Sequence, residues 1–412
     1  MNGMTSIEKK LIDFIVNKRH VLFLLLIVLV GAVIRLAGRN YMSPDMLYCL
    51  IPWFDQIRDA GGLPALSAQV GDYGLLYQTI ISFMTYLDIS PAYQYKMLSV
   101  TFDVAMAVMV AVIYRDIMLN GISGKGQDLT KDQGYKRRVL FQSCVVGAVV
   151  WLLPTVIVNS AYWGQCDSMY TFFCLATLYW LRKDKFVAAF VFLGLAFSCK
   201  LQTVFFLPFI GTYYLVSKRF TVLNVLISVA VLWFSGALAF AYGRSLLEPY
   251  TIYQNQTLDY NEMFLNFSSA WVIVGNDYDA LEPFAILFTL FAVLAGAFVC
   301  MRNKRFLDAR EDYYAIAAWF VWTMVLFLPS MHDRYAYSLD IMLFVIGFIQ
   351  RRYLKYAILS MLISFYHYGH YLIDERYQEP IVLAAVYLLA YVHFSFTLYK
   401  RLKGRESLAV GQ

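Results

Sequence analysis

Acidic, basic, amide and aromatic side chains that could bind or activate a polar ligand interrupt the apolar sequence at four places. One is an aspartate early in the chain, a second is the run Asn159–Ser168, and a third is a lysine between two apolar runs. The fourth is the pentapeptide Met331–Tyr335. A simple membrane turn needs only to be short and hydrated, so these residue types indicate a site for a polar ligand. The candidates are Asp45, Trp163, Gln165, Asp167, Lys200, Gln202, His332, Arg334 and Tyr335.

The two strong cations among these candidates indicate an anionic ligand. Only a handful of residues separate Lys200 from apolar runs, and a charge at membrane depth costs roughly 2.5–3.5 kcal/mol on insertion scales. The planar fork of Arg334 suits a phosphate. Structural alternatives stay open for both residues. Lys200 could snorkel to the membrane surface or pair with Asp167, and Arg334 could pair with Asp333 or another carboxylate.

The composition places these residues in a membrane protein. Hydrophobic residues make up 60% of the chain and charged residues 15%, and the mean hydropathy is +0.57. A soluble domain of this length could not bury so much apolar surface. Apolar runs such as 21–37 and 381–397 are close to the ~20 residues that a helix needs to cross a ~30 Å hydrocarbon core. We therefore expect an all-α polytopic membrane protein, and the formal charge of +6 does not indicate nucleic-acid binding.

The distribution of lysine and arginine predicts the topology. With a cytoplasmic N-terminus and about twelve spans, 26 of the 34 Lys and Arg residues fall on the cytoplasmic side, many of them in the loops 119–138 and 302–310. This arrangement requires the apolar segment 74–90 to be an amphipathic or re-entrant helix on the outer face. Both termini are then cytoplasmic and the long loops 38–94 and 243–283 are outside. All the candidate residues share that outer face.

The helix that would position Asp45 has a recognisable start. Ser43 can cap the helix, Pro44 suits the first helical position, and the dipole favours a carboxylate in the first turn. Apolar residues follow at helical spacing, so we expect a helix along the membrane surface with a lipid-facing stripe. Asp45 could equally do no more than stabilise this helix end. The stripe consists of Leu47, Leu50, Ile51, Phe54 and Ile57.

The order of these motifs resembles the GT-C superfamily of membrane glycosyltransferases over about residues 20–340. The closest likeness is to the branch that holds relatives of the second GPI mannosyltransferase and the dolichyl-phosphate-glucose-dependent glucosyltransferases. Such relatives commonly carry Lys-Pro-Gln and His-Glu-Arg-Tyr where this chain has Lys-Leu-Gln and His-Asp-Arg-Tyr, and both changes keep the charge pattern. The first outer loop has no Asp-x-Asp, which disfavours an oligosaccharyltransferase. The likeness rests on Ser43-Pro44-Asp45, Asn159–Ser168, Lys200-Leu201-Gln202 and His332-Asp333-Arg334-Tyr335.

The resemblance implies a single integral membrane domain over residues 1–412, with a GT-C module at 20–242 and more variable C-terminal helices at 243–412. It implies transfer of a hexose such as mannose or glucose from a polyprenyl-phosphate sugar. The acceptor would be a hydroxyl of a lipid-linked or cell-surface glycan at the outer face. No cofactor is expected, and nothing in the sequence supports a metal requirement.

The resemblance also implies a role for each candidate residue. Asp45 would be the general base that takes the proton of the acceptor hydroxyl in one inverting displacement. Lys200 and Arg334, with His332 as a hydrogen-bond donor, would stabilise the leaving phosphate. Asp167 is the second candidate for this base, but its preferred role is to orient Lys200 or the acceptor. The remaining candidates would contact the substrates or shape the pocket, although aromatic residues are also common at membrane interfaces. These candidates are Trp163, Gln165, Gln202 and Tyr335.

Two other functions stay open. A polysaccharide polymerase or ligase also has about twelve spans and outer Arg and His residues, but it relies mainly on one large late outer loop. A flippase or transporter for lipid-linked sugars would need charged or broken helices near mid-membrane and an internal repeat. Arg35 and Asp103 are the candidates for such charges, and no repeat is evident. The compact loops favour a bacterial plasma membrane, with an endoplasmic reticulum membrane as the alternative.

Overall fold

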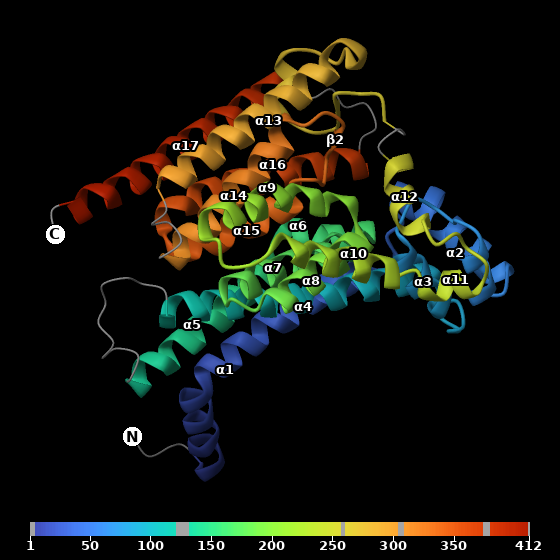
Figure 1. Cartoon of the computed structure of the whole chain (residues 1–412). Helices are drawn as coiled ribbons and strands as arrows, with labels where there is room; N and C mark the ends of the chain where they lie inside the picture. Colours follow the sequence, from blue (N-terminus) through green and yellow to red (C-terminus); the bar gives the residue numbers. More distant parts are fainter. Residues whose placement is uncertain (1–4, 121–131, 257–259, 304–308, 374–379, 411–412) are drawn as a thin grey trace.

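Helices form almost all of the protein (Figure 1). The computed structural model describes residues 5–120, 132–256, 260–303, 309–373 and 380–410. Within this part the β-structure consists of one short parallel pair, β1 (Phe264–Leu265) with β2 (Met331–His332). The expected all-α class is therefore confirmed. Parts of the predicted cytoplasmic loops 119–138 and 302–310, namely 121–131 and 304–308, lie outside the described residues.

The bundle consists of long and medium-length helices that pack side by side. Apolar residues dominate these helices, and large aromatic side chains such as Trp322, Tyr313 and Tyr353 are fully buried between them. The long helices are α1 (Ser6–Ala37), α4 (Pro91–Asn120), α5 (Gln133–Leu152), α13 (Tyr278–Arg302), α16 (Leu354–Ile373) and α17 (Ile381–Val410). The medium-length helices are α7 (Asp167–Arg182), α8 (Phe186–Cys199), α9 (Leu207–Ser217), α10 (Val225–Phe234), α14 (Arg310–Phe327) and α15 (Tyr337–Ile349).

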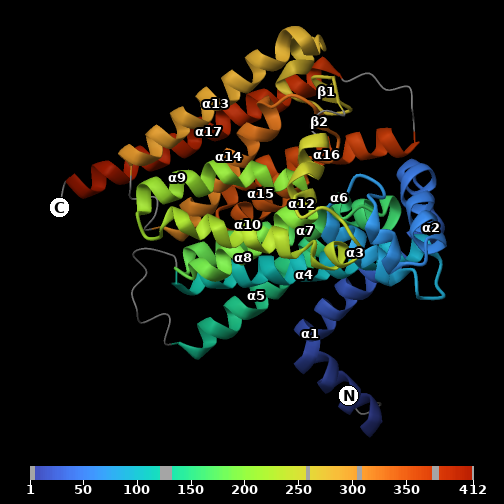
Figure 2. The ribbon, with the colours of Figure 1, turned by 45° about the vertical axis from the view of Figure 1, so that its right-hand side comes forward.

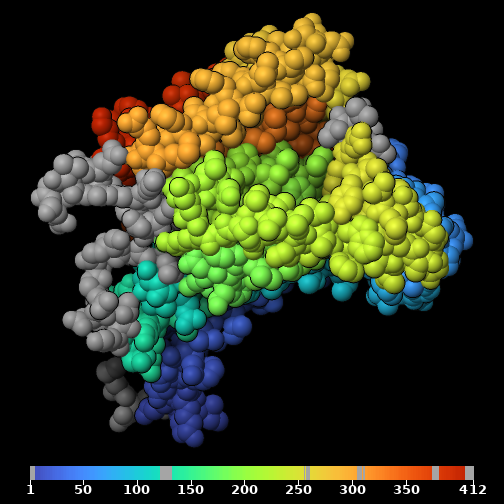
Figure 3. Space-filling model, in the orientation of Figure 1, coloured from blue at the N-terminus to red at the C-terminus, as the bar shows by residue number. Residues whose placement is uncertain are grey.

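Short helices gather at one end of the bundle. In Figure 1 they lie at the right, opposite the two chain ends, and Figure 3 shows the segment around α12 against the N-terminal short helices. The predicted long loops 38–94 and 243–283 thus share one end of the molecule. These helices are α2 (Ile51–Asp59), η3 (Leu63–Ser67), α3 (Leu75–Met84), α11 (Ala237–Ala241) and α12 (Glu248–Gln256). Connecting turns are η1 (Gly38–Asn40), η2 (Met46–Leu50), α6 (Pro154–Ile157), η4 (Val158–Trp163), η5 (Leu201–Phe206), η6 (Val222–Asn224), η7 (Ala270–Ile273) and η9 (Arg351–Tyr353).

The expected count of about twelve membrane spans is not confirmed. Among the described residues, four helical segments are long and apolar enough to cross a membrane, or five if α5 and the bent continuation Pro154–Trp163 form one span. That continuation turns by 56°. Several other apolar helices have only 10–17 residues, such as α8, which ends just before Lys200. At the end of α8 the helix is interrupted by the polar motif itself, because the backbone of Lys200 is extended.

The segment predicted to lie on the outer face forms α3, which at ten residues is about 15 Å long and too short to cross a hydrocarbon core. Its polar side chains face the protein and part of its apolar side faces outward. Gln78 is buried and donates to the carbonyl oxygen of Ala68 at 2.9 Å, and Ser82 is buried. Phe83, by contrast, is 51% exposed. The helix therefore turns polar side chains into the protein and leaves part of its apolar side exposed.

The prediction of a lipid-facing stripe after Asp45 is wrong for most of its members. Leu50, Phe54 and Ile57 are each at most 2% exposed, whereas Leu47 is 49% exposed. The ring of Phe54 contacts that of Tyr95 at the start of α4, with centroids 6.1 Å apart. The segment η2–α2 folds back over the end of the bundle, so its apolar stripe joins the protein core instead of facing lipid.

A buried ion pair ties α1 to α4 and α5. Arg35 Nη2 lies 2.8 Å from Asp103 Oδ2, and both side chains are almost fully buried. Ser160 Oγ donates to the same carboxylate oxygen at 2.6 Å, and Arg35 Nη2 donates to the carbonyl oxygen of Trp151 at 3.0 Å. The two charges considered for a transport path therefore neutralise each other inside the helix packing.

Candidate active site

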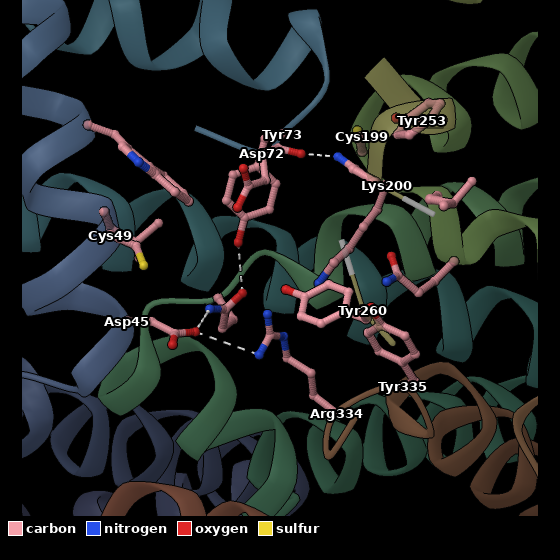
Figure 4. Close-up of a pocket in the computed structure, with 16 residues that line it drawn as sticks. Asp45, Cys49, Asp72, Tyr73, Cys199, Lys200, Tyr253, Tyr260, Arg334 and Tyr335 are labelled. Carbon is pink, nitrogen blue, oxygen red and sulfur yellow. Dashed lines mark hydrogen bonds and ion pairs between the residues drawn. The ribbon is translucent and has the colours of Figure 1, made fainter. Parts of the chain in front are cut away.

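One cavity of about 180 Å³ at the end with the short helices collects most of the predicted site residues (Figure 4). Its walls come from η2 and α2, the loop before α3, the start of η5, α12, and the segment after β2. The candidate residues that line it are Asp45, Gln165, Lys200, Gln202, Arg334 and Tyr335. The other candidates, Trp163, Asp167 and His332, lie behind this wall.

The helix start that carries Asp45 forms as predicted. Helical structure begins at Pro44, and the Ser43 hydroxyl accepts a hydrogen bond from the backbone N–H of Met46 at 3.1 Å. The same hydroxyl donates to the carbonyl oxygen of Trp163 at 2.9 Å. The cap thus joins the helix of Asp45 to the second motif, which holds the carboxylate at a fixed place against that motif.

The carboxylate of Asp45 accepts hydrogen bonds on both of its oxygens. Trp163 Nε1 donates to Oδ2 at 2.9 Å, and Gln165 Nε2 donates to the same atom. The hydroxyl of Tyr371, near the end of α16, donates to Oδ1. Arg334 Nη1 lies 3.6 Å from Oδ2. These contacts fix the orientation of the carboxylate, which still lines the cavity.

The local backbone explains how Trp163 and Gln165 reach Asp45. The segment η4 ends at Trp163 and is followed by Gly164, whose φ of +80° is a left-handed conformation that glycine adopts without strain. A Cβ at this position would lie 2.4 Å from Met46 Cε. After the turn, the side chain of Gln165 accepts a hydrogen bond from the Tyr73 hydroxyl at 2.9 Å, which orients its amide nitrogen toward Asp45. Trp163 itself is fully buried and stacks on Tyr371, with centroids 4.8 Å apart.

Lys200 pairs with Asp167, which was one of the structural alternatives for this lysine. Lys200 lies in the break between α8 and η5, and its Nζ donates to Asp167 Oδ1. Asp167 opens α7, is 1% exposed, and accepts a second hydrogen bond from Asn159 Nδ2 at 2.7 Å. The pair is therefore desolvated and held from both sides. Lys200 nevertheless lines the cavity, so its charge acts on anything that enters.

Arg334 stands among three carboxylates without forming a short hydrogen bond to any of them. Its guanidinium nitrogens lie 3.6 Å from Asp45, 3.8 Å from Asp167 and 3.7 Å from Asp333. Burial opposes its charge, but these carboxylates together raise the pKa of Arg334 above its ordinary value. Its buried Nε has no hydrogen-bond partner among the described residues. Arg334 is thus charged, lines the cavity, and forms no short hydrogen bond with the carboxylates around it.

The strand pair positions the motif that contains Arg334. The backbone N–H of Asp333 donates to the carbonyl oxygen of Leu265 at 3.1 Å, so the late long loop is attached directly to this motif. Burial raises the pKa of the Asp333 carboxyl to about 7. Burial together with Arg334 and Lys200 lowers the pKa of His332 to about 3, so the imidazole is neutral near pH 7. His332 contacts the rings of Tyr260 and Tyr335 at centroid distances of 4.4 and 4.9 Å.

A second cavity, of about 250 Å³, adjoins the first and is mainly apolar. Two of the candidate residues, Gln202 and Tyr335, line both cavities. The second cavity extends between η5, the first turns of α13 and the segment after α14. Its own apolar walls are Val204, Phe205, Ile286, Leu328 and Met331. The wall residues common to both are Leu201, Gln202, Gln256, Tyr260 and Tyr335.

Sequence reasoning missed the role of Tyr371 and gave no role to Tyr73 or Tyr260. Tyr371 follows Asp45 by 326 residues, and its helix contains several other tyrosines, so spacing gives no signal for it. Tyr73 belongs to the Asp72-Tyr73 pair in the first long loop, where a carboxylate neighbour was the more visible feature. All three tyrosines lie in polar stretches at the end of the bundle that holds the pocket. That position is the feature that could have marked them as site residues.

The fold and the site together define an all-α membrane protein with a charged pocket at one end of its bundle. The model of glycosyltransferase family 87 matches residues 73–329. The chain belongs to glycosyltransferase family 87 and is therefore a membrane glycosyltransferase. This membership agrees with the GT-C resemblance, while the particular branch stays a prediction.

The matched region contains only part of the pocket. Gln165, Lys200 and Gln202 lie within the match, whereas Asp45 and Arg334 lie outside it. A comparison with curated proteins finds no match. The roles of the individual residues must therefore be argued from the geometry of the pocket.

Proposed function

We propose that this glycosyltransferase moves a hexose from a polyprenyl-phosphate sugar to a hydroxyl of a lipid-linked or cell-surface glycan, with inversion at the anomeric carbon. One observation carries the proposal: a well-oriented carboxylate, Asp45, lines the same cavity as two cations, Lys200 and Arg334. An inverting displacement needs a base on one side of the sugar and charge stabilisation for the leaving group on the other.

The cations suit the leaving group. A sugar bound to polyprenyl phosphate is a phosphodiester, and breaking its glycosidic bond leaves a phosphate with one more negative charge. Arg334 has donors that are not used by short hydrogen bonds, and Lys200 is fixed by Asp167. The side chains of Lys200 and Arg334 are only 8% and 19% exposed. Electrostatic stabilisation is stronger at such a site than in water. Positive charge is thus supplied by the protein, and the proposed step needs no metal ion.

The carboxylate of Asp45 suits the role of general base. Asp45 is held by Trp163, Gln165 and Tyr371, and its position on the cavity wall would let it accept the proton of an acceptor hydroxyl. Trp163 does not line the cavity, so we assign it to positioning Asp45 rather than to stacking on the sugar. Asp167 orients Lys200. Gln202 and Tyr335, at the border between the two cavities, are the residues that we place against the donor.

The adjoining apolar cavity supports a donor with a lipid tail. The polar pocket would take the sugar and phosphate, and the first isoprene units would pass Gln202 and Tyr335 into the space beside α13. A water-soluble nucleotide sugar would leave this apolar space empty. The short helices that form walls of the pocket lie at the end opposite both chain ends, which supports action on the outer face of the membrane if the termini are cytoplasmic (Figure 1).

The test is sugar transfer by the purified protein in detergent. It receives radiolabelled polyprenyl-phosphate sugars in parallel with the matching nucleotide sugars, and a membrane glycolipid extract as acceptor. We expect label to move from one polyprenyl-phosphate sugar only. Asp45→Asn should reduce transfer by about 10²–10⁴-fold, because that is the usual contribution of a general base. The matched control is Asp59→Asn, since Asp59 is exposed on the same segment and does not line the cavity.

Two outcomes would contradict the proposal. Transfer from a nucleotide sugar would refute the donor class, and near-normal turnover by Asp45→Asn would refute the assigned base. A flippase is the main alternative function, and a flux assay in proteoliposomes separates the two. The mutual pairing of Arg35 and Asp103 gives a carrier mechanism no free charge at that place.

A further inference from the structure

An apolar groove of about 600 Å³ lies between α1, α4 and α5 and belongs to no part of the site described above. Its walls are almost entirely apolar, and several of them are open to the surroundings: Val104, Val108 and Val112 of α4 are 48%, 57% and 38% exposed. The α1 wall comes from the half of that helix that packs near α4 and α5, and Figure 2 shows α1 diverging from both toward its N-terminus.

Each wall of the groove is one stripe of a helix. The residues recur at intervals of three and four, which places them on a single helical face. Small residues line its floor, and a Cβ at Gly147 would lie only 2.8 Å from the carbonyl oxygen of Ala107. The stripe of α4 is Val104, Ala107, Val108, Ala111, Val112 and Arg115, and that of α5 is Leu140, Ser143, Cys144, Gly147, Ala148 and Trp151.

The two ends of the groove differ. Trp151 closes the end near the active site, with the guanidinium of Arg35 3.4 Å from the centre of its ring. Arg115 lines the opposite end, is exposed, and makes no hydrogen bond or ion pair with any described residue. The carboxylate next to it, Asp116, accepts a hydrogen bond from Lys183 on the other side of α4. One turn before Leu140, the exposed Lys136 and Arg137 add positive charge at this end of α5.

The length of the groove matches one leaflet of a bilayer. Val104 and Arg115 are eleven residues apart, which is about 16 Å along a helix, and the hydrocarbon core of a bilayer is about 30 Å thick. A partner transmembrane helix would need a face along the whole core, but Trp151 closes this groove part-way. A groove that binds one acyl chain needs to extend only through the leaflet that contains the lipid.

We propose that this groove is a binding site for an anionic phospholipid of the leaflet on the side of the chain ends. One acyl chain lies between α1, α4 and α5, and the phosphate rests on Arg115. The charge at the open end selects an anionic headgroup, and the apolar walls take the chain. The site is separate from sugar transfer, so it can be tested whether or not the proposed donor is correct.

The experiment is native mass spectrometry of the purified full chain after adding phosphatidylglycerol or phosphatidylcholine at matched concentrations. We expect the protein to retain phosphatidylglycerol preferentially. Because a hydrogen bond to a charged group is at stake, Arg115→Gln should weaken this retention about tenfold. The control is Arg302→Gln, since Arg302 ends α13 on the same side of the bundle and does not line the groove. Ala111→Phe fills the groove and should reduce retention of both lipids.

The proposal fails if both lipids are retained equally, or if Arg115→Gln and Arg302→Gln have the same effect. It also fails if the groove variants shift the protein between monomer and dimer while lipid retention is unchanged, because the occupant would then be a second copy. Monodispersity and the melting temperature of each variant show that the comparison uses folded protein.

Discussion

The charged side chains of the pocket differ in whether short hydrogen bonds hold them. Asp167 fixes Lys200, and Asp45 is held by hydrogen bonds, but Arg334 is surrounded by carboxylates at distances too long for hydrogen bonds. A planar guanidinium in this position can offer two parallel N–H groups to a phosphate oxygen pair. The arginine is therefore the residue whose shape, and not only whose charge, matters for the proposed reaction.

This distinction predicts the behaviour of Arg334→Lys. The variant keeps a positive charge but replaces the fork with a point charge, so we expect kcat/KM for the polyprenyl-phosphate sugar to fall about 10–100-fold. The measurement is steady-state transfer with the melting temperature as a check on folding. Arg58→Lys serves as the control, because Arg58 lies at the same end of the molecule with a half-exposed side chain. Equal turnover by Arg334→Lys and the wild type would show that charge alone suffices.

His332 predicts a pH dependence of stability. Burial lowers its pKa to about 3 in the folded protein, against an ordinary value of 6.5. Between these values the unfolded chain binds a proton that the folded chain does not, so stability present above pH 6.5 is lost as the pH falls toward 3. His332→Gln should remove this loss, and its melting temperature should decline less than that of the wild type from pH 6.5 to 4.5.

Asp333 acts in the opposite direction but does not disturb the comparison. Its folded-state pKa of about 7 means that stability decreases as the pH rises through about 4 to 7. This contribution is present in both proteins, so the difference between them reports His332. Parallel melting curves for the two proteins over this range would contradict a neutral, buried imidazole.

At the scale of elements, the sequence predicted where helices begin and break better than it predicted which helix faces are buried. The cap at Ser43, the helix start at Pro44 and the surface helix α3 follow from local rules that the structure obeys. The stripe containing Leu50 and Phe54 is apolar in either environment, and only the fold-back over Tyr95 decides that it is buried. Lipid and protein core select the same residue types, so periodicity alone could not tell them apart.

The turn at Gly164 is the element on which the pocket depends most. Gly164→Ala introduces strain at a φ of +80° and places a Cβ 2.4 Å from Met46 Cε. The backbone strain alone should cost about 1–2 kcal/mol, and the shift of Trp163 and Gln165 should lower transfer further. Combining it with Met46→Ala removes the clash but not the strain, so the double variant should recover part of the activity. If the double variant recovers no activity, the clash with Met46 is not the cause of the loss.

At the scale of the whole molecule, sequence predicted the class and the composition of the site but not how its parts meet. The order of motifs indicated an all-α membrane glycosyltransferase, and six of the candidate residues line one cavity. The count of about twelve spans was not confirmed, because several of the apolar helices have only 10–17 residues. Pairings between distant segments, such as Leu265 with His332, have no signature in a single sequence.

The ion pair of Arg35 and Asp103 predicts an effect on the whole bundle. Arg35→Gln leaves Asp103 buried without its partner, so we expect a loss of about 3–5 kcal/mol and a clear drop in melting temperature in detergent. Arg35→Gln combined with Asp103→Asn removes both charges and should recover much of the loss. If the double variant melts no higher than the single one, the pair is not the source of the stability. The carrier alternative would instead gain support if flux in proteoliposomes fell in these variants by more than their loss of folded protein explains.

The hydrogen bonds around Asp45 join residues that the ribosome synthesises at very different times. Asp45 is made early, whereas its partner Tyr371 follows 326 residues later, and the Tyr41 hydroxyl donates to the carbonyl oxygen of Leu372 at 2.7 Å. Arg334 is likewise a late addition. A ribosome-bound chain that has inserted only its first helices therefore holds a carboxylate without its supports and a cavity without its arginine. If the proposed roles of these residues are correct, the chain becomes active only after α16 has folded against the first long loop.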